Sequence, residues 1–189
     1  MRLHYIAHPS RTLSAGYQEI VQRIETRRRA TGLLPLDLTL LHAPEIANGW
    51  NTLFDAIRTK NSLAEDIREI AICRTALINR AWFEWNAHAP ILQHCKGFTI
   101  DQFETVKQRS PSCQGVLNNQ QWAVLRYADI MTTEVAVPQA LFDEVRATGF
   151  SAQQMVELTA TIATYNMVGR FLVALDVGEE NDKPPDWAV

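Results

Sequence analysis

The chain has 189 residues, of which 47% are hydrophobic, and its formal net charge at pH 7 is −3. A chain of this length and composition can bury a substantial core as one globular protein without disulfides or metal ions. The negative net charge argues against nucleic acid as a partner, because proteins that bind nucleic acid normally present a basic face.

Three cysteines, at positions 73, 95 and 113, form no Cys-x-x-Cys pair. An odd number of cysteines without a signal peptide indicates a reducing compartment. The N-terminus lacks a continuous apolar signal region, and no run of residues reads as long enough to cross a bilayer. We therefore expect a soluble, cytoplasmic protein with no membrane partner.

Hydrophobic periodicity predicts helices throughout and no convincing strand, which gives an all-α fold class. Gly32 and Gly97 are predicted to end helices. Ser62–Glu65, Thr99–Gln102 and Ser151–Gln154 have the spacing of capping boxes, which open helices. The expected helices cover about 11–31, 36–42, 44–60, 62–79, 82–95, a short segment opening at Thr99, 119–133, 138–148 and 151–176.

Two segments lie outside these helices. Residues 110–118 contain Ser, Pro, Gly and paired Asn, and they form the main predicted loop, a candidate lid or partner contact. The tail that begins at Gly178 contains paired prolines and is expected to leave the domain, where it either frays or docks on a neighbouring subunit.

The segment from Glu69 to His88 carries the strongest chemical signal. Glu84 and His88 are four residues apart, so on a helix they lie on one face. Glu69 belongs to the preceding helix, and a hairpin of the two helices would bring all three side chains into one apolar pocket. Such a group of titratable side chains can transfer protons to and from carbon without a cofactor.

Several motifs around this segment resemble those of the carboxymuconolactone decarboxylase family, which shares its fold with alkylhydroperoxidase D. The resemblance implies an alkylhydroperoxidase D-like helical bundle with a central hairpin, assembled as a ring or hexamer. The apolar content of the Trp82–Cys95 helix exceeds what one face can bury in a monomer, so we expect a homotrimer or a hexamer. On the basis of the resemblance 1–32 is an N-terminal helical extension, 33–178 is the carboxymuconolactone decarboxylase-like domain, and 179–189 is a C-terminal tail. The motifs are LLPLD at 33–37, HAPEIANGW at 42–50, the Glu69–Arg74 run, EWNAHAP at 84–90 and YNMVGRFLVAL at 165–175.

One branch of this family carries a redox Cys-x-x-Cys-x-x-x-His motif. Counted back from His88, the two thiol positions hold Ala81 and Glu84, so the peroxide-reducing dithiol is absent. The chain is therefore similar to the other branch, in which Glu and His perform acid/base chemistry.

The resemblance implies a role for each candidate residue. His88 is the expected acid/base, Glu84 its orienting partner and Glu69 a second proton-transfer group. Arg74 or Arg170 would hold a substrate anion, because a guanidinium binds a carboxylate with two hydrogen bonds. Asn166 and Trp85 complete the expected substrate-binding set.

Structural alternatives stay open for these residues. Arg170 and Asn166 could belong to a buried ion pair that locks the last helix, and Trp85 could be a core residue. Metal binding is not expected, because Glu-x-x-x-His differs from the Glu-x-x-His repeat of di-metal bundles. No Gly-rich loop follows a strand, so no nucleotide cofactor is expected.

The residues themselves predict a cofactor-independent acid/base enzyme. The resemblance implies a lyase or isomerase that decarboxylates or isomerises a small carboxylated, lactone or enolisable substrate in aromatic or natural-product metabolism. One alternative is a peroxidase with relocated thiols, which Cys73 or Cys95 would have to support. The other is a non-catalytic oligomeric protein whose pocket is filled by Trp82, Trp85 and Phe171.

Overall fold

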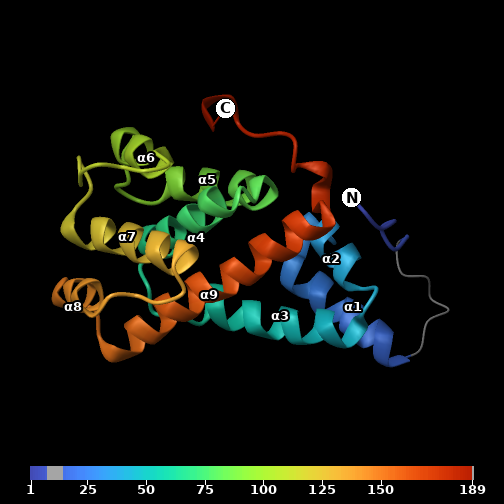
Figure 1. Cartoon of the computed structure of the whole chain (residues 1–189). Coiled ribbons are helices and arrows are strands. Elements are labelled where there is room, and N and C mark those ends of the chain that lie inside the picture. Colours follow the sequence, from blue (N-terminus) through green and yellow to red (C-terminus); the bar gives the residue numbers. More distant parts are fainter. Residues whose placement is uncertain (8–14, 189) are drawn as a thin grey trace. The chain divides into compact units, whose positions relative to one another are not determined.

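The structure is a computed structural model, and it describes residues 1–7 and 15–188 (Figure 1). Within these residues every regular element is a helix, as the sequence predicts. The α-helices are α1 (Ala15–Arg28), α2 (Pro35–Leu40), α3 (Pro44–Thr59), α4 (Glu65–Asn79), α5 (Trp82–His94), α6 (Ile100–Lys107), α7 (Asn119–Thr133), α8 (Gln139–Ala147) and α9 (Ala152–Leu175). Short 3-10 helices are η1 (Arg29–Thr31), η2 (Val177–Glu179) and η3 (Asp186–Ala188).

The chain forms two compact units. One contains Met1–Asn61 and Leu175–Glu179, and the other contains Ser62–Ala174 and the tail from Glu180. The start of the expected 11–31 helix, residues 11–14, lies outside the described residues.

The first unit joins segments that the sequence analysis assigned to different parts of the chain. Arg28, at the end of α1, donates two hydrogen bonds of 2.7 and 2.8 Å to the carboxylate of Asp37 in α2. The same carboxylate accepts the backbone N–H of Leu34 at 2.8 Å, which caps α2. Helix α1 also packs against α3. Residues 1–32 are thus tied to the segment that follows them, and the units divide after Asn61 rather than after Gly32.

Helix α4 is the central helix of the second unit. It packs against α5, α6 and α7 (Figure 1). Residues 69–77 of this helix are buried without interruption. A helix that is buried on every side lies inside the core and not on its surface. The helices α4 and α5 form the predicted hairpin, which turns at Arg80 in the left-handed conformation, with φ 52° and ψ 36°.

The start of α4 differs from the prediction. The N-cap residue is Ala64, and its side chain makes no capping hydrogen bond. Ser62, the predicted cap, instead donates from its backbone N–H and its hydroxyl to one carboxylate oxygen of Glu157 in α9, at 2.9 and 2.7 Å. A charged acceptor on another helix has replaced the local capping box, since charge-assisted hydrogen bonds are the stronger ones.

Helix α9 approaches the α4–α5 turn closely at Gly169. A Cβ atom at this position would lie 3.3 Å from Nδ2 of Asn79 and 3.4 Å from Cβ of Ala81. One turn earlier, Asn166 accepts a hydrogen bond of 3.1 Å from Asn79. This close packing fixes the face of α9 that meets the hairpin.

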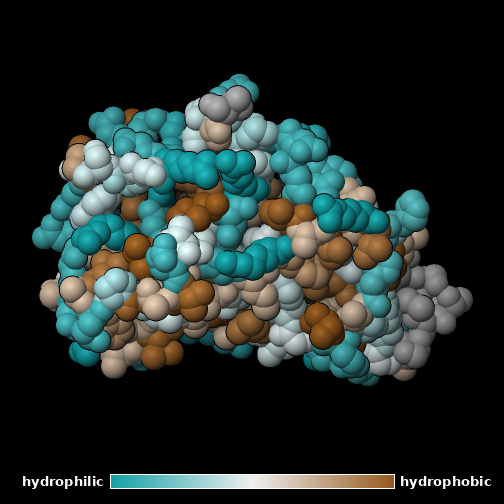
Figure 2. All heavy atoms as spheres, in the orientation of Figure 1, coloured by the Kyte–Doolittle hydropathy of each residue, from teal (hydrophilic) through white to brown (hydrophobic). Residues whose placement is uncertain are grey.

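By length and composition α9 could cross a membrane, a possibility that the sequence analysis missed. Half of its apolar window is buried in the structure, and the core helix of a soluble protein passes the same test of length and composition. On the face shown in Figure 2, hydrophobic side chains reach the surface in patches separated by hydrophilic ones.

Candidate functional site

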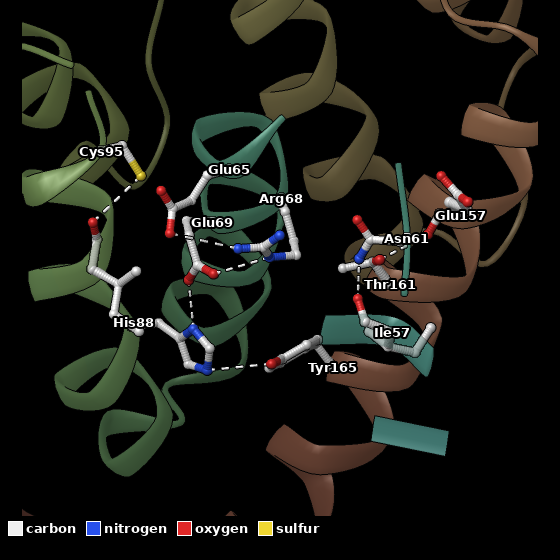
Figure 3. Close-up of polar contacts among 11 residues, drawn as sticks. Ile57, Asn61, Glu65, Arg68, Glu69, His88, Cys95, Glu157, Thr161 and Tyr165 are labelled. Carbon is white, nitrogen blue, oxygen red and sulfur yellow. Dashed lines mark hydrogen bonds and ion pairs between the residues drawn. The ribbon is translucent and has the colours of Figure 1, made fainter. Parts of the chain in front are cut away.

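The second unit buries a connected group of polar side chains contributed by α4, α5 and α9 (Figure 3). Glu69 lies in α4 and is fully buried. Its Oε2 atom lies 2.6 Å from Nδ1 of His88, and its Oε1 atom accepts a hydrogen bond of 3.2 Å from Nε of Arg68. A buried carboxylate is costly unless it is paired, and these two contacts supply the pairing.

His88 lies in α5 and joins the group through both of its ring nitrogens. Nδ1 faces Glu69, and Nε2 lies 3.3 Å from the hydroxyl of Tyr165 in α9. With Glu69 ionised, its oxygens can only accept, so Nδ1 carries a proton, and in the neutral imidazole the lone pair is then on Nε2. Nε2 then accepts from the hydroxyl of Tyr165. The side chains form a chain of hydrogen bonds, Glu69–His88–Tyr165, and we call it the buried relay.

The two ends of the buried relay differ in strength. The contact between Glu69 and His88 is short at 2.6 Å, whereas the contact between His88 and Tyr165 is long at 3.3 Å. Hydrogen bonds to a charged acceptor are the short and strong ones. Nδ1 therefore makes the stronger of the two contacts of the His88 ring.

Arg68 gives the buried relay its balancing positive charge. Its side chain is 15% exposed and its Nη2 atom lies 3.8 Å from Oε1 of Glu65, one turn earlier on α4. Arg68 thus pairs with both Glu65 and Glu69 of its own helix.

The orienting carboxylate is not the one expected. Glu84 was expected to hold His88 from one turn away on the same helix, yet Nδ1 of His88 is held by Glu69 from the other arm of the hairpin. Glu84 itself is buried, with 3% of its surface exposed. It lies on α5, one turn before His88.

The thiols are poorly suited to redox chemistry. Burial raises the pKa of the Cys73 thiol well above its ordinary value, and the negative charges of Glu69 and Glu84 raise it further. Burial also raises the pKa of Cys95 to about 12. Only a thiolate attacks a peroxide readily, so neither buried cysteine is activated. Cys113 is exposed, and all three cysteines are free.

Arg74 has a different role from the one expected. It is fully buried, and all five of its N–H donors are used within the protein. Two of them bind the carboxylate of Asp129 in α7, at 2.8 and 2.7 Å. The other three bind the backbone carbonyls of Val106, Gln108 and Arg109. No donor is left for a substrate anion, so Arg74 anchors the segment that follows α6.

Asn166 and Arg170 are joined to each other by hydrogen bonds. Asn166 donates to Thr132 in α7 and to the backbone of Ile162, both at 3.1 Å, and accepts from Asn79 in α4. Arg170 is exposed and donates to the side chain and backbone oxygens of Asn166. Asn166 thus links three helices, and its contacts are structural.

Trp85, the remaining expected substrate contact, is 3% exposed and lies in the core of the second unit. Its ring centroid lies 6.0 Å from that of Phe103 and 5.0 Å from that of Trp187. Among the described residues, no group of three or more His, Cys, Asp or Glu side chains is arranged to hold a metal ion.

Tyr165 was not predicted as a site residue. It is 1% exposed, and its ring meets the edge of the His88 ring at 87°, with centroids 5.2 Å apart. The sequence holds a signal for it: Tyr165 follows Leu158 and Ile162 on the apolar stripe of α9, and a buried tyrosine hydroxyl needs a polar partner.

Similar folds occur among solved structures. The chain matches an alkylhydroperoxidase D core structure, an uncharacterized peroxidase-related protein from Ralstonia eutropha JMP134, with a TM-score of 0.72 and 21% identity over 96% of both chains. A peroxidase-related protein from Silicibacter sp. TM1040 matches with a TM-score of 0.71 and 16% identity, over 92% of this chain and 91% of that one.

A third match is the debrominase Bmp8, solved as a cysteine-to-alanine variant in complex with 2,3,4-tribromopyrrole. It has a TM-score of 0.68 and 17% identity over 92% of each chain. No protein-family model and no curated protein matches the chain. Similarity at this level of identity establishes the fold: the chain has the alkylhydroperoxidase D-like all-helical fold that its motifs predict.

Proposed function

We propose that this chain is a cofactor-independent acid/base enzyme that decarboxylates or isomerises a small carboxylated, lactone or enolisable substrate. The observation that carries the proposal is the buried relay, in which a carboxylate orients a histidine whose other nitrogen lies 3.3 Å from a tyrosine hydroxyl. A histidine held in this way is a general acid or base near neutral pH.

The roles follow from the geometry. Glu69 fixes the His88 ring through Nδ1 and stabilises the imidazolium when Nε2 takes a proton. Tyr165 occupies Nε2 in the resting protein and is displaced, or relays the proton, when substrate is present. Glu84 is the second buried carboxyl group of the region and a candidate for a second proton transfer.

In the decarboxylation, the bond between the substrate carboxylate and its carbon breaks, and carbon dioxide leaves. The electron pair of that bond remains as an enolate, which then takes one proton at carbon from the imidazolium of His88. Isomerisation uses the same atom twice, because Nε2 removes a proton from one carbon and returns it to another.

The thiol alternative has less support. The positions that hold the redox dithiol in the related branch are Ala81 and Glu84. The two buried cysteines elsewhere have raised pKa values, with burial as the largest cause. The peroxidase-related names of two structural neighbours therefore do not carry over to this chain as an activity.

We also propose that the protein is a cytoplasmic homotrimer or hexamer. Val156 and Met167 lie eleven residues apart on α9, which is three helical turns, and they are 69% and 40% exposed. An apolar groove formed by α8 and α9 includes Val156 and Met155. A second copy of the chain is the occupant that this proposal assigns to the exposed apolar face.

The test compares two histidines of α5. A panel of β-keto acids and lactone carboxylic acids is incubated in D₂O, and carbon dioxide release and deuterium incorporation are followed by NMR. His88→Gln should lower the rate about 10²- to 10⁴-fold, the usual effect of losing a positioned acid/base group. His94→Gln is the matched control, because His94 is exposed and bonds only to the backbone oxygen of Pro90 among its described contacts.

Near-wild-type turnover by folded His88→Gln would refute the assignment. So would a hundredfold loss on replacing all three cysteines by serine in a folded protein, because that result would favour the thiol chemistry.

A further inference from the structure

The second unit contains a cavity that is separate from the buried relay. Its volume is about 330 Å³, within the range of roughly 300–1,000 Å³ that is usual for small-molecule sites. Residues of the α4–α5 turn, of α6 and the segment after it, and of the C-terminal tail line it. They include Arg80, Trp82, Glu104, Lys107, Arg109 and Trp187.

The lining is positively charged, with three cations and one carboxylate. Lys107 already has a partner, since its Nζ atom lies 2.7 Å from Glu104. Among the described residues, the guanidinium groups of Arg80 and Arg109 make no hydrogen bond or ion pair. Two guanidinium groups at one cavity are thus available to bind an anion.

The wall that carries Arg109 is rigidly built. Arg74 binds the backbone carbonyls of Val106, Gln108 and Arg109 from inside the core, and Asp129 holds Arg74 in turn. Because Arg74 is fully buried, its hydrogen bonds hold the backbone of residues 106–109 from inside the core. A preorganised wall costs little ordering entropy when a ligand binds.

Arg80 occupies an unusual backbone position for an arginine. It ends α4 in the left-handed conformation, with φ 52° and ψ 36°, where glycine or asparagine is the usual residue. A residue with a long side chain is sterically disfavoured here. Backbone positions of this kind persist where the surrounding structure holds them, and they occur often at functional sites.

The opposite wall is aromatic and comes from the tail. The Trp187 ring lies 5.0 Å from the Trp85 ring, and the Lys107 ammonium lies 5.4 Å above Trp187. The tail is also attached to α5 by the hydrogen bond between Asn86 and Glu180, at 3.3 Å. The tail was expected to leave the domain and to fray or dock on a neighbouring subunit, but it packs on its own second unit and places an indole ring at the same cavity as the arginines.

We propose that this cavity binds a small, flat carboxylate, such as an aromatic carboxylate. The guanidinium groups of Arg80 and Arg109 bind the carboxylate, and the indole rings of Trp82 and Trp187 contact the flat body of the ligand. The proposal goes beyond the proposed function, because the cavity shares no lining residue with Glu69, His88 or Tyr165.

Equilibrium binding tests the proposal with 4-fluorobenzoate as the probe, followed by fluorine NMR. The neutral 4-fluorobenzamide and acetate are the comparison ligands, because each lacks one half of the recognised chemistry. We expect saturable binding of the benzoate, with the amide and acetate each at least tenfold weaker.

The key variant is Arg80→Asn, because asparagine accepts the left-handed conformation and has no charge. Binding of 4-fluorobenzoate should weaken about tenfold or more, the usual effect of losing a charged hydrogen bond, while the melting temperature does not fall. Arg109→Gln should behave in the same way. Arg23→Gln, which changes an exposed arginine of the first unit, should leave binding unchanged.

Equal affinity for the benzoate and the benzamide would overturn the proposal, as would unchanged benzoate binding by Arg80→Asn. His88→Gln is expected to bind the probe like the wild type. Failure of the proposed catalytic function is therefore distinguishable from failure of this binding site.

Discussion

Replacement of Arg74 by methionine is the sharpest test of the structural role that we assign to this arginine. Methionine keeps much of the volume and removes every N–H donor. Its effect on the free energy of unfolding follows from the contacts that are lost. The Asp129 carboxylate loses both of its hydrogen bonds to Arg74, and three backbone carbonyls lose their donor.

Breaking a buried ion pair by removing one partner typically costs about 3–5 kcal/mol, because the other charge is left without compensation. For a domain of this size each kcal/mol lowers the melting temperature by about 2–4 °C. We therefore expect Arg74→Met to melt roughly 6–20 °C below the wild type, and urea unfolding should give the same loss of stability.

Arg126→Met is the matched control. Arg126 also binds a carboxylate with short contacts, 2.6 and 2.7 Å to Glu144, yet both side chains are about 40% exposed. An exposed pair contributes about 1 kcal/mol or less. If Arg74→Met loses no more stability than Arg126→Met, the anchoring role is refuted, and a role in substrate binding would again be the better explanation.

Three further predictions concern the thiols, Glu157 and the assembly. A variant with all three cysteines replaced by serine should turn over its substrate within a few-fold of the wild type, because neither buried thiol is activated; turnover of folded protein measures this. Burial raises the pKa of Glu157, but hydrogen bonds from Gln153 and Ser62 lower it overall. The stabilising effect of Glu157 is therefore present above the pKa of the glutamate in the unfolded chain, and it is lost as the pH falls through the lower pKa of the folded state. The difference in urea stability between the wild type and Glu157→Gln should accordingly shrink in acid. Light scattering should show a trimer or hexamer at micromolar concentration that Val156→Glu dissociates, and a wild-type monomer would contradict the proposed assembly.

Helix positions could be predicted from the sequence because their signals are local. Thr99 and Gln102 form the predicted capping box of α6, with hydrogen bonds of 2.8 and 3.2 Å. Gly32 and Gly97 have positive φ angles at the predicted helix ends. The capping box at Ser62 was wrong, since Glu157 lies 95 residues away and local spacing cannot show it.

The candidate site could be predicted in part. The helical hairpin that would join Glu69 to His88 was correctly predicted, and the structure brings these two residues together. Helical spacing suggested Glu84 as the partner because it compares residues on one helix. Helical spacing alone cannot show whether His88 contacts Glu84 on its own helix or Glu69 on the other helix of the hairpin, because the second contact depends on how the two helices pack. The same limit hid Tyr165, which is 77 residues from His88 in the chain.

The α4–α5 hairpin contributes residues to both the buried relay and the cavity, at different positions along its helices. Glu69 and Arg80 are eleven residues apart, which corresponds to about 16 Å along a helix axis. Neither His88, Glu69 nor Tyr165 lines the cavity, so we expect a small carboxylate to be bound there while a substrate occupies His88. We expect 4-fluorobenzoate to leave the apparent KM for the true substrate unchanged, with any inhibition confined to kcat. Competitive inhibition that Arg80→Asn abolishes would show instead that the cavity and His88 belong to one substrate site.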